Sequence, residues 1–408
     1  MNRFKTVVYS TLITLLLVSI GFSFLYFKYI NPLEKGNEVP ADSLVTASSE
    51  ISLKDAHTKI ETVYVKNKLN DKITASRQTI ITETVKKVSP AVVGINVTKV
   101  KKYRDPFTSD PLFRYFFGDR VYTQKVKALG SGVIISPDGY IVTNDHVAGD
   151  ATEIIVTMTD GSQHPAKIIG SDKATDICLL KIEGKNLPYI KFGNSDDILI
   201  GEWVIALGNP FGLFEINDKP TVTVGVISAT GMNLNAVNGR YYINMIQTDA
   251  AINTGNSGGP LVNSLGELIG INTLIFTPGG SPGNIGVGFA IPVNKVKKII
   301  KQLKEKGKID RNFWTGLIIQ NLDERIAKYF GLSSTKGVIV TDVIKGSPAE
   351  KAGIVVSDII IGVDGFMVTD DESIISILNQ YSTGDVLNIK LIRDGKTQTV
   401  KMKLEPKR

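Results

Sequence analysis

The chain contains the stretch Gly255-Asn256-Ser257-Gly258-Gly259-Pro260. Glycines on both sides of a serine permit a backbone turn that bulkier residues would block, with successive N–H groups aimed at one point. Donors arranged in this way stabilise the oxyanion of an acyl-transfer intermediate. A serine is a weak nucleophile at neutral pH unless a base takes its proton. The stretch therefore predicts a nucleophilic Ser257 and requires a base and an acid elsewhere.

The histidines identify the base. The chain has three, and all precede Ser257. The G-x-S-x-G elbow of α/β-hydrolases needs its acid and histidine after the serine, so that class is excluded. His57 lies in a polar stretch, and we expect His164 in an exposed loop. His146 closes a β-branched run over residues 140–147, which predicts a base held at the end of a strand.

The acid must lie between the base and the nucleophile for the order His, Asp, Ser. Asp176 directly precedes an apolar run over residues 177–182. An acid that enters buried β structure needs a partner, because an unpaired buried charge is costly. Orienting His146 supplies one. Asp172 fits an ordinary turn aspartate better, so we predict a triad of His146, Asp176 and Ser257.

Three separated segments resemble the HtrA (DegP/DegS-type) serine proteases. They occur in the family's order at residues 143–147, 170–182 and 247–260, and the similarity runs from about residue 79 to the C-terminus. The resemblance implies a chymotrypsin-like double β-barrel followed by one or two PDZ domains. It also implies a homotrimer, with unfolded or misfolded polypeptides as substrates.

The chymotrypsin-like architecture implies further site residues. Backbone N–H groups of Gly255, Asn256 and Ser257 are expected to form the oxyanion hole. Ala251 occupies the floor of the primary pocket, and an apolar floor favours a small aliphatic residue before the scissile bond. The pocket wall and the substrate-pairing strand are expected at Ile271, Asn272, Thr273 and Leu274. No metal or cofactor is called for, since an HExxH motif and clustered Cys and His residues are absent from the sequence.

Composition is that of a globular, multidomain chain. It has 408 residues, of which 42% are hydrophobic and 21% charged. The single cysteine, Cys178, excludes an intramolecular disulfide framework. The net charge of +7 is modest for this length and gives no reason to expect nucleic-acid binding. Lysines between residues 295 and 308 are expected on a solvated helix face and linker.

The N-terminus predicts a membrane anchor. Residues 6–27 carry no charge and are bracketed by Lys5 and Lys28. As a helix they would span about 33 Å, enough for the hydrocarbon core of a bilayer. We expect a retained single-pass signal anchor in the cell (inner or plasma) membrane, with residues 1–5 cytoplasmic and the catalytic part outside. Residues 28–78 are polar without apolar periodicity and predict a stalk.

Residues 79–303 are expected to form the protease domain. Short β-branched segments separated by Gly, Pro and Asp turns indicate an antiparallel sandwich or barrel. Val296, Ile299, Ile300 and Leu303 have helical spacing and predict a helix that ends the domain. The fold class is therefore mostly β.

A linker at residues 304–311 precedes a second, α+β module at residues 312–405. Strands are expected at 337–343, 357–363, 386–393 and 397–404, with a helix at 371–379. The order resembles the PDZ domain of HtrA proteases, which accepts a C-terminal peptide as an extra strand. The family's carboxylate-binding loop corresponds to Trp314, Thr315, Gly316 and Leu317.

The sequence thus predicts an extracytoplasmic, membrane-anchored serine endopeptidase under PDZ control. Its expected substrates are misfolded or regulatory envelope proteins, cleaved after small aliphatic residues. Two alternatives remain open. One is a catalytically weak chaperone or scaffold on the same fold, and the other is an esterase that uses the same triad.

Overall fold

The computed structural model describes residues 77–104, 121–209, 214, 218–253, 255–275 and 285–407. The predicted anchor at 6–27 and nearly all of the predicted stalk lie outside these residues. Among the described helices, none has the length and apolar character needed to cross a membrane.

The first barrel closes on itself in the order β1-β2-β3-β6-β5-β4, with antiparallel neighbours. Closure pairs the strands around the barrel, and the far ends of β1 and β2 pair only with each other. Its strands are β1 (Val92–Arg104), β2 (Val121–Ile134), β3 (Tyr140–Thr143), β4 (Glu153–Thr157), β5 (Gln163–Asp172) and β6 (Ile177–Ile182).

The second barrel repeats this design in the order β10-β11-β12-β9-β8-β7. The turn around Ser257 leads directly into β10, so Ser257 is carried by this barrel. Its strands are β7 (Trp203–Gly208), β8 (Thr221–Met232), β9 (Met245–Thr248), β10 (Pro260–Asn263), β11 (Leu268–Ile275) and β12 (Gly288–Pro292).

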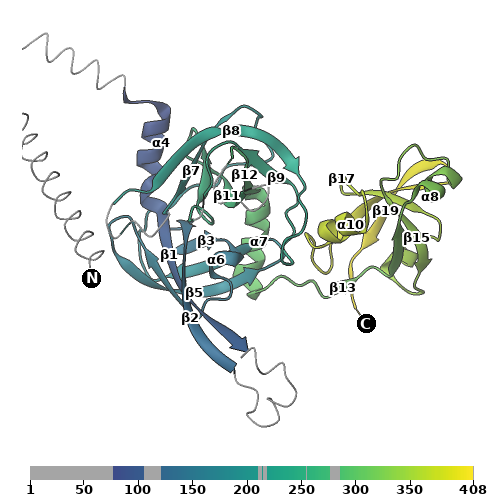
Figure 1. Ribbon diagram of the computed structural model, residues 1–408, viewed down its shortest axis with the longest axis horizontal. Coiled ribbons are helices and arrows are strands. Elements are labelled where there is room, and N and C mark those ends of the chain that lie inside the picture. Colours follow the sequence, from purple (N-terminus) through teal and green to yellow (C-terminus); the bar gives the residue numbers. More distant parts are fainter. Residues whose placement is uncertain are drawn as a thin grey trace, which may run out of the picture. The chain divides into compact units, whose positions relative to one another are not determined.

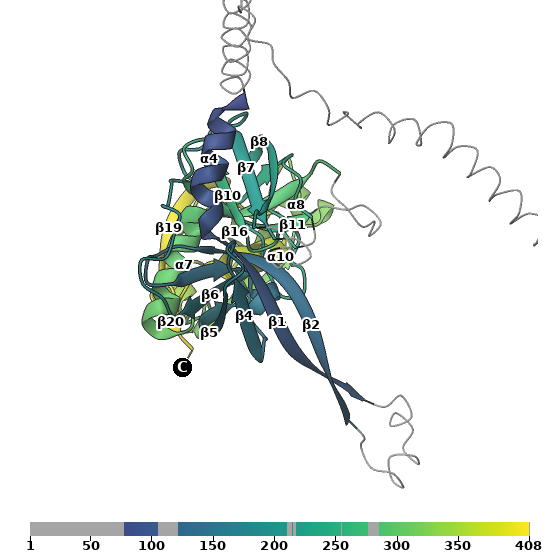
Figure 2. The same ribbon diagram turned by 90° about the vertical axis from the view of Figure 1, so that its left-hand side faces the viewer.

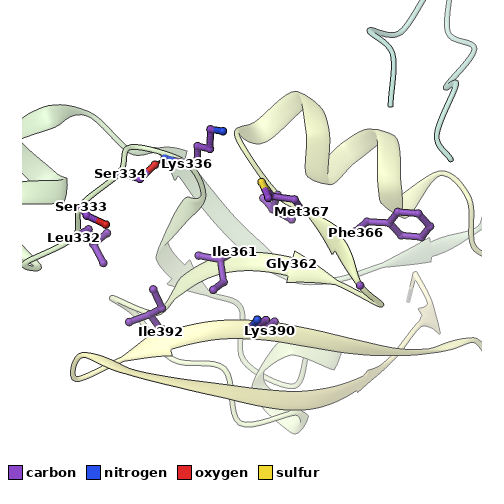
Figure 3. A pocket seen from close by; sticks show the side chains of 12 residues that line it. Leu332, Ser333, Ser334, Lys336, Ile361, Gly362, Phe366, Met367, Lys390 and Ile392 are labelled. Carbon is purple, nitrogen blue, oxygen red and sulfur yellow. Dashed lines mark hydrogen bonds between the residues drawn. The ribbon is translucent and has the colours of Figure 1, made fainter. Parts of the chain in front are cut away.

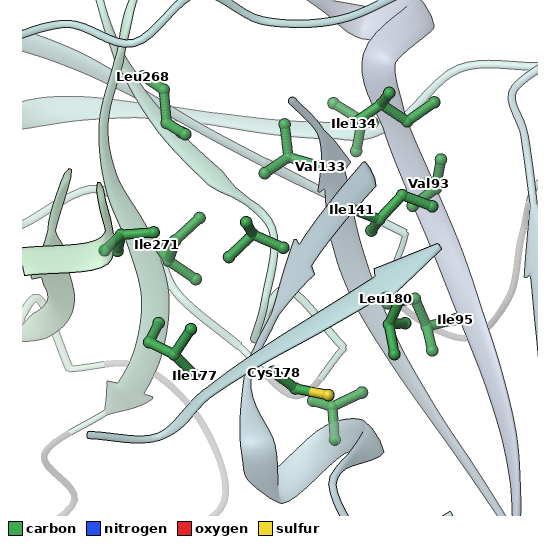
Figure 4. Packing of buried hydrophobic residues seen from close by; sticks show 14 of the residues in the cluster. Val93, Ile95, Val133, Ile134, Ile141, Ile177, Cys178, Leu180, Leu268 and Ile271 are labelled. Carbon is green, nitrogen blue, oxygen red and sulfur yellow. The ribbon is translucent and has the colours of Figure 1, made fainter. Parts of the chain in front are cut away.

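Apolar side chains fill the first barrel. Ile95 on β1, Ile141 on β3 and Leu180 on β6 have no exposed surface, and Figure 4 shows them among the clustered side chains of these strands. Cys178 is equally buried and serves as a small apolar core residue. Five of the six residues of β6 are buried, which is why its sequence is a nearly continuous apolar run.

Two helices pack on the barrels. Helix α4 (Ile80–Val88) begins with a capping box at Thr79, and the Thr84 hydroxyl donates to the Ser264 carbonyl at 2.5 Å. Helix α7 (Val293–Lys306) ends at Gly307, whose φ of 71° suits only a residue without Cβ constraints. It contacts β5 and β6 of one barrel and β11 and β12 of the other, so it fastens the two barrels together.

Strands β1 and β2 stay paired along their whole length, from Val92 opposite Val133 to Arg104 opposite Val121. Figures 1 and 2 both show their far ends leaving the barrel as a two-stranded ribbon.

The C-terminal module is an open sheet in the order β14-β15-β16-β18-β19, with β17 paired to β16. The strand and helix pattern expected from the sequence is present here, with ends shifted by one or two residues. The elements are β13 (Phe313–Trp314), β14 (Leu317–Asn321), α8 (Glu324–Tyr329), β15 (Val338–Val343), α9 (Pro348–Lys351), β16 (Ile359–Val363), β17 (Phe366–Met367), α10 (Asp371–Leu378), β18 (Val386–Arg393), β19 (Lys396–Lys403) and β20 (Glu405–Pro406).

Two sequence-based expectations are wrong. The strand expected over residues 140–147 ends at Thr143, and α6 (Asp145–Ala148) follows as one helical turn that carries His146. His164 lies in β5 rather than in a loop, although Pro165 follows it. Pro165 is exposed, and strands tolerate proline where its missing N–H is not needed.

The core predicts a stability effect. Leu180→Ala should lower the free energy of unfolding by about 2–5 kcal/mol, because the fully buried leucine leaves a cavity. Leu199→Ala is the matched control, since that side chain is 70% exposed and should change stability little. Chemical denaturation of both variants checks this, and equal losses would contradict the packing described for β6.

Candidate active site

The turn around Ser257 docks on the first barrel. Ser131 on β2 donates its N–H to the Ser257 carbonyl at 2.9 Å and its hydroxyl to the Gly255 carbonyl at 2.5 Å. Gly258 has a φ of 84°, and a Cβ there would collide with the Ser131 carbonyl and the Thr143 hydroxyl. The glycines are thus required both by conformation and by the close approach of the two barrels.

The structure brings His146 and Asp176 into direct contact. His146 Nδ1 lies 2.9 Å from Asp176 Oδ2 and 3.0 Å from Oδ1, and the His146 backbone N–H donates to Oδ1 at 3.0 Å. The His146 side chain is 33% exposed, whereas Asp176 is fully buried. A carboxylate at Nδ1 fixes a tautomer with its proton there, which leaves Nε2 free to act as a base.

Asp176 is held by donors from both barrels. Thr273 on β11 donates its hydroxyl to Oδ2 at 2.7 Å, Tyr242 donates its hydroxyl to Oδ2 at 3.3 Å, and Arg240 Nε donates to Oδ1 at 3.1 Å. Burial by itself raises the pKa of Asp176, but hydrogen bonds from His146 and Thr273 bring the pKa below its ordinary value. The carboxyl group of Asp176 is therefore ionised in the folded protein near neutral pH.

Asp176 also has an unusual backbone. Its φ is 60°, in the left-handed region where few residues other than glycine are found. The Asn144 side-chain amide donates to the Asp176 carbonyl at 3.0 Å and helps to hold this conformation. Such strain persists only where surrounding contacts determine it, and it is typical of functional sites.

The nucleophile turns away from the base. Ser257 Oγ donates to the Thr273 carbonyl at 3.1 Å, and among the described residues no hydrogen bond joins it to His146. The Asn256 N–H donates to the Asn253 carbonyl at 3.0 Å. Within the described residues the N–H groups of Gly255 and Ser257 have no partner, so they are the donors open to an oxyanion.

The predicted substrate residues lie near the nucleophile in different roles. Ala251 is partly exposed, and its carbonyl accepts the Thr223 hydroxyl at 2.9 Å. Thr273 directs its side chain to Asp176 rather than outward. Ile271 has no exposed surface, and its side chain packs in the core.

Asn272 and Leu274 complete that predicted set. The Asn272 N–H donates to the Gly259 carbonyl at 2.9 Å, and its carbonyl accepts the Gly258 N–H at 2.8 Å. It therefore supports the turn from behind, with no exposed surface. Leu274 lies in β11, opposite Phe289 of β12.

The other candidate residues lie elsewhere. His164 Nε2 is 3.2 Å from the hydroxyl of Ser162, which directly precedes β5, and His57 lies outside the described residues. Asp172 forms a two-point ion pair with Arg311, with Nη1–Oδ1 2.5 Å and Nη2–Oδ2 2.8 Å. Burial raises the pKa of Cys178 to about 12, so its thiol stays protonated and unreactive.

No group of His, Cys, Asp and Glu side chains suited to a metal ion occurs in the part of the chain that the structure describes.

Comparisons with known proteins agree with this geometry. Residues 130–271 match the trypsin-like peptidase domain family, and residues 315–404 match the PDZ domain family. The "Probable periplasmic serine endoprotease DegP-like" of Pseudomonas putida (strain GB-1) is 41% identical over 340 residues, 78% of this chain and 68% of that relative. This chain belongs to the HtrA family of trypsin-like serine endoproteases.

Further relatives support the assignment. The Chlamydia pneumoniae protein with the same name is 45% identical over 300 residues, 72% of this chain and 59% of that relative. The solved structure "HtrA-type protease AlgW with decapeptide" is 37% identical, with a TM-score of 0.59, and the match covers 81% of this chain and 99% of that chain. The expected mostly β fold, a double barrel followed by a PDZ domain, is confirmed.

In the PDZ domain of this HtrA protease, the segment expected to bind a carboxylate leads into β14. Trp314 pairs with Glu405, and the Thr315 carbonyl accepts the Ala349 N–H at 3.0 Å. Gly316 has a φ of 74°, and a Cβ there would collide with Ser347. Leu317 opens β14, which is an edge strand that contacts α10.

A separate cavity of about 390 Å³ lies elsewhere in this PDZ domain (Figure 3). Its apolar lining comes from β16, β17 and β18, and includes Ile361, Phe366, Met367 and Ile392. None of the carboxylate-loop residues lines it.

Sequence reasoning missed Arg240, Tyr242 and the role of Thr273. Their side chains reach Asp176 only because the barrels fold together, and no motif places them there. Asp145 was also missed, although it stands directly before His146 and binds Arg240.

Ser257→Ala should leave the fold of this HtrA protease intact and abolish peptidase activity. Loss of a triad serine lowers turnover on the order of 10⁶-fold. Hydrolysis of a casein substrate and thermal unfolding of the same preparation check both halves. Turnover that survives removal of contaminating proteases would show that Ser257 is not the nucleophile.

Activity should rise with pH through about pH 6–7.5, because the base must begin neutral. Asp176 stays ionised throughout, since its pKa is lowered. His146→Ala should remove the activity, and His164→Ala, as the control, should keep the whole profile. Loss in His164→Ala but not in His146→Ala would reassign the base.

Proposed function

We propose that Ser257, His146 and Asp176 carry out the peptide hydrolysis of this HtrA protease. The observation that carries the proposal is the contact of 2.9 Å between His146 Nδ1 and the buried Asp176 carboxylate. Ser257 Oγ attacks the peptide carbonyl carbon while His146 Nε2 takes its proton. The same nitrogen then returns the proton to the leaving amine, and water repeats the sequence on the acyl-enzyme.

The amide groups of Gly255 and Ser257 stabilise the oxyanion in this proposal. Both are open within the described residues, whereas the Asn256 N–H is taken by Asn253. We therefore remove Asn256 from the set of donors expected from the sequence. Each lost donor of this kind typically costs a factor of about 10²–10³ in turnover.

Attack requires the Ser257 hydroxyl to leave the Thr273 carbonyl and turn toward His146. A rotation about the Ser257 Cα–Cβ bond would redirect the hydroxyl in this way. This hydrogen bond is the one observation that favours the alternative of a catalytically weak chaperone on the same fold. A serine whose hydroxyl donates to Thr273 cannot give its proton to His146 without first rotating. Turnover by the purified chain separates these readings.

Substrate preference follows from Ala251. Its methyl group offers no charge to a Lys or Arg side chain, so we propose cleavage after small aliphatic residues. Asn272 supports the nucleophile turn, and Leu274 continues the strand on which a substrate backbone would pair.

The PDZ domain is proposed to bind C-terminal peptides along β14. An edge strand presents unpaired N–H and C=O groups to an added strand, and the N–H groups of the loop from Trp314 to Leu317 would hold the terminal carboxylate. The AlgW structures with a decapeptide and a tripeptide support a peptide ligand for this protein family.

Location and assembly complete the proposal. Several relatives are named periplasmic, and residues 6–27 have the length and composition of a single-pass anchor. We propose a cell-membrane protein whose stalk (28–78) carries the protease (79–303), linker (304–311) and PDZ domain (312–405) outside the cytoplasm. Misfolded or regulatory envelope proteins are its proposed substrates, and a homotrimer its proposed assembly.

A peptide library tests the substrate class. The purified full chain is incubated with peptides of all sequences, and mass spectrometry identifies the cleaved bonds. We expect Ala, Val and similar residues before the scissile bond. Ala251→Asp, which adds a carboxylate to the proposed floor, should shift preference toward Lys and Arg. An unchanged profile in that variant would remove Ala251 from the pocket.

Removal of residues 312–408 tests the PDZ proposal. The remaining protease should stay folded, since its barrels and α7 form their own core. Its turnover should no longer respond to added C-terminal peptides, because the domain proposed to bind them is gone. Equal stimulation of the truncated and full-length proteins by one peptide would show that the PDZ domain is not the sensor.

A further inference from the structure

An arginine outside the triad holds the buried Asp176 carboxylate. Arg240 Nε donates to Asp176 Oδ1 at 3.1 Å, and Arg240 Nη2 donates to Asp145 Oδ2 at 2.7 Å. Asp145 directly precedes His146 in α6. One guanidinium therefore joins the catalytic carboxylate to the helical turn that carries the base. Its side chain is only 17% exposed.

A tight hairpin presents this arginine. Val237 and Arg240 exchange two backbone hydrogen bonds of 3.0 Å, and the residues between them, Asn238 and Gly239, have φ values of 54° and 76°. Two positive φ values and an Asn-Gly pair are typical of a type I′ turn, which fixes the register of its flanks. The N–H of the next residue donates to the Ala174 carbonyl at 2.8 Å, beside the Asp176 turn.

Arg240 places a positive charge against the carboxylate that contacts His146. Asp176 stabilises an imidazolium, and a cation on the same carboxylate offsets part of that stabilisation. Asp145 has the opposite effect, because its carboxylate neutralises part of the arginine charge. Its other oxygen accepts the Ser171 hydroxyl at 2.7 Å, which fixes its orientation.

We propose that Arg240 is a positioning residue of the catalytic site, which orients Asp176 and the His146 turn and sets by its charge the pH at which His146 becomes a competent base. The inference rests on the proposed triad. It adds a residue that touches neither substrate nor the reacting atoms.

Other charged or titratable groups face the cluster from several elements. Lys99 Nζ donates to the His146 carbonyl at 2.9 Å and also pairs with Asp150, so it does not contact the Asp176 carboxylate. Burial raises the pKa of both the Cys178 thiol and the Tyr242 hydroxyl, which keeps them neutral during the experiment below. The facing groups are Asp145 on α6, Lys99 on β1, Asp150 after α6, Cys178 on β6, Tyr242 after the hairpin and Lys295 on α7.

The test is the acid limb of the pH–rate profile of the full chain. Arg240→Gln should move its midpoint upward by about one pH unit, because a unit charge near the dyad is removed. Asp145→Asn should move the midpoint downward. Arg240→Lys keeps the positive charge but loses the guanidinium group that bonds Asp176 and Asp145 at once. The midpoint of the acid limb should therefore stay unchanged while turnover falls. Peptide kcat/KM and labelling of Ser257 by a fluorophosphonate are both followed between about pH 5 and 9.

The matched control is Arg325→Gln. Arg325 is also paired with an aspartate, Asp323 at 3.2 Å, but its side chain is 93% exposed in the PDZ domain. This variant should keep the midpoint and the turnover of the unaltered protein. A shift equal to that of Arg240→Gln would show a general charge effect and overturn the proposal.

Two results decide against Arg240. Lower turnover at every pH with an unmoved midpoint, in both Arg240→Gln and Arg240→Lys, would make the arginine a structural residue only. If Arg240→Gln fails to fold in a thermal scan, Asp145→Asn decides, and an unmoved or raised midpoint refutes the proposal. Ser257→Ala is measured in parallel. Retained hydrolysis there refutes the triad itself, whereas its loss beside an unmoved midpoint refutes Arg240 alone.

Discussion

The burial of one carboxylate constrains most of this structure. Asp176 has no contact with water, and a charge in that position is stable only when surrounded by donors. The donors come from distant parts of the chain, with His146 after the first barrel's β3 and Thr273 on the second barrel's β11. Satisfying Asp176 therefore requires both barrels to be in place. Folding and assembly of the catalytic site are one event for this part of the molecule.

A second, neutral link works in the same direction. Ser131 on β2 binds two carbonyls of the nucleophile turn, and its hydroxyl in turn accepts the Asn209 N–H at 2.7 Å. Gly258 closes the gap, because any side chain there would push the turn away from β2. The position of Ser257 is thus set by packing between barrels as much as by its own turn. The Ser257 hydroxyl can still change its hydrogen-bond partner by rotation, and in this structure it donates to the Thr273 carbonyl.

The sequence allowed the fold class to be predicted and the proposed triad to be chosen, because both depend on local signals. Glycines flank the serine, and turns interrupt the short apolar segments. The helical turn at His146 was missed because four residues are too few for a periodic pattern. The burial of the Ile271 side chain could not be read from the sequence, because residues on both faces of its strand are buried and no alternation marks them. Arg240 comes from a hairpin whose docking on Asp176 is purely tertiary.

The open sheet of the PDZ domain has two ends with different surfaces. One end, β19, carries exposed Lys396, Lys401 and Lys403, and lysines on an edge discourage another strand from joining it. The other end, β14, has no charged residue and exposes Ile318. The barrels are closed, although the far ends of β1 and β2 leave the first barrel as a two-stranded ribbon. Under the proposed function the protein handles unfolded chains, which could add to a free strand edge and nucleate aggregates. Within the PDZ sheet, this arrangement confines that risk to the five-residue strand β14.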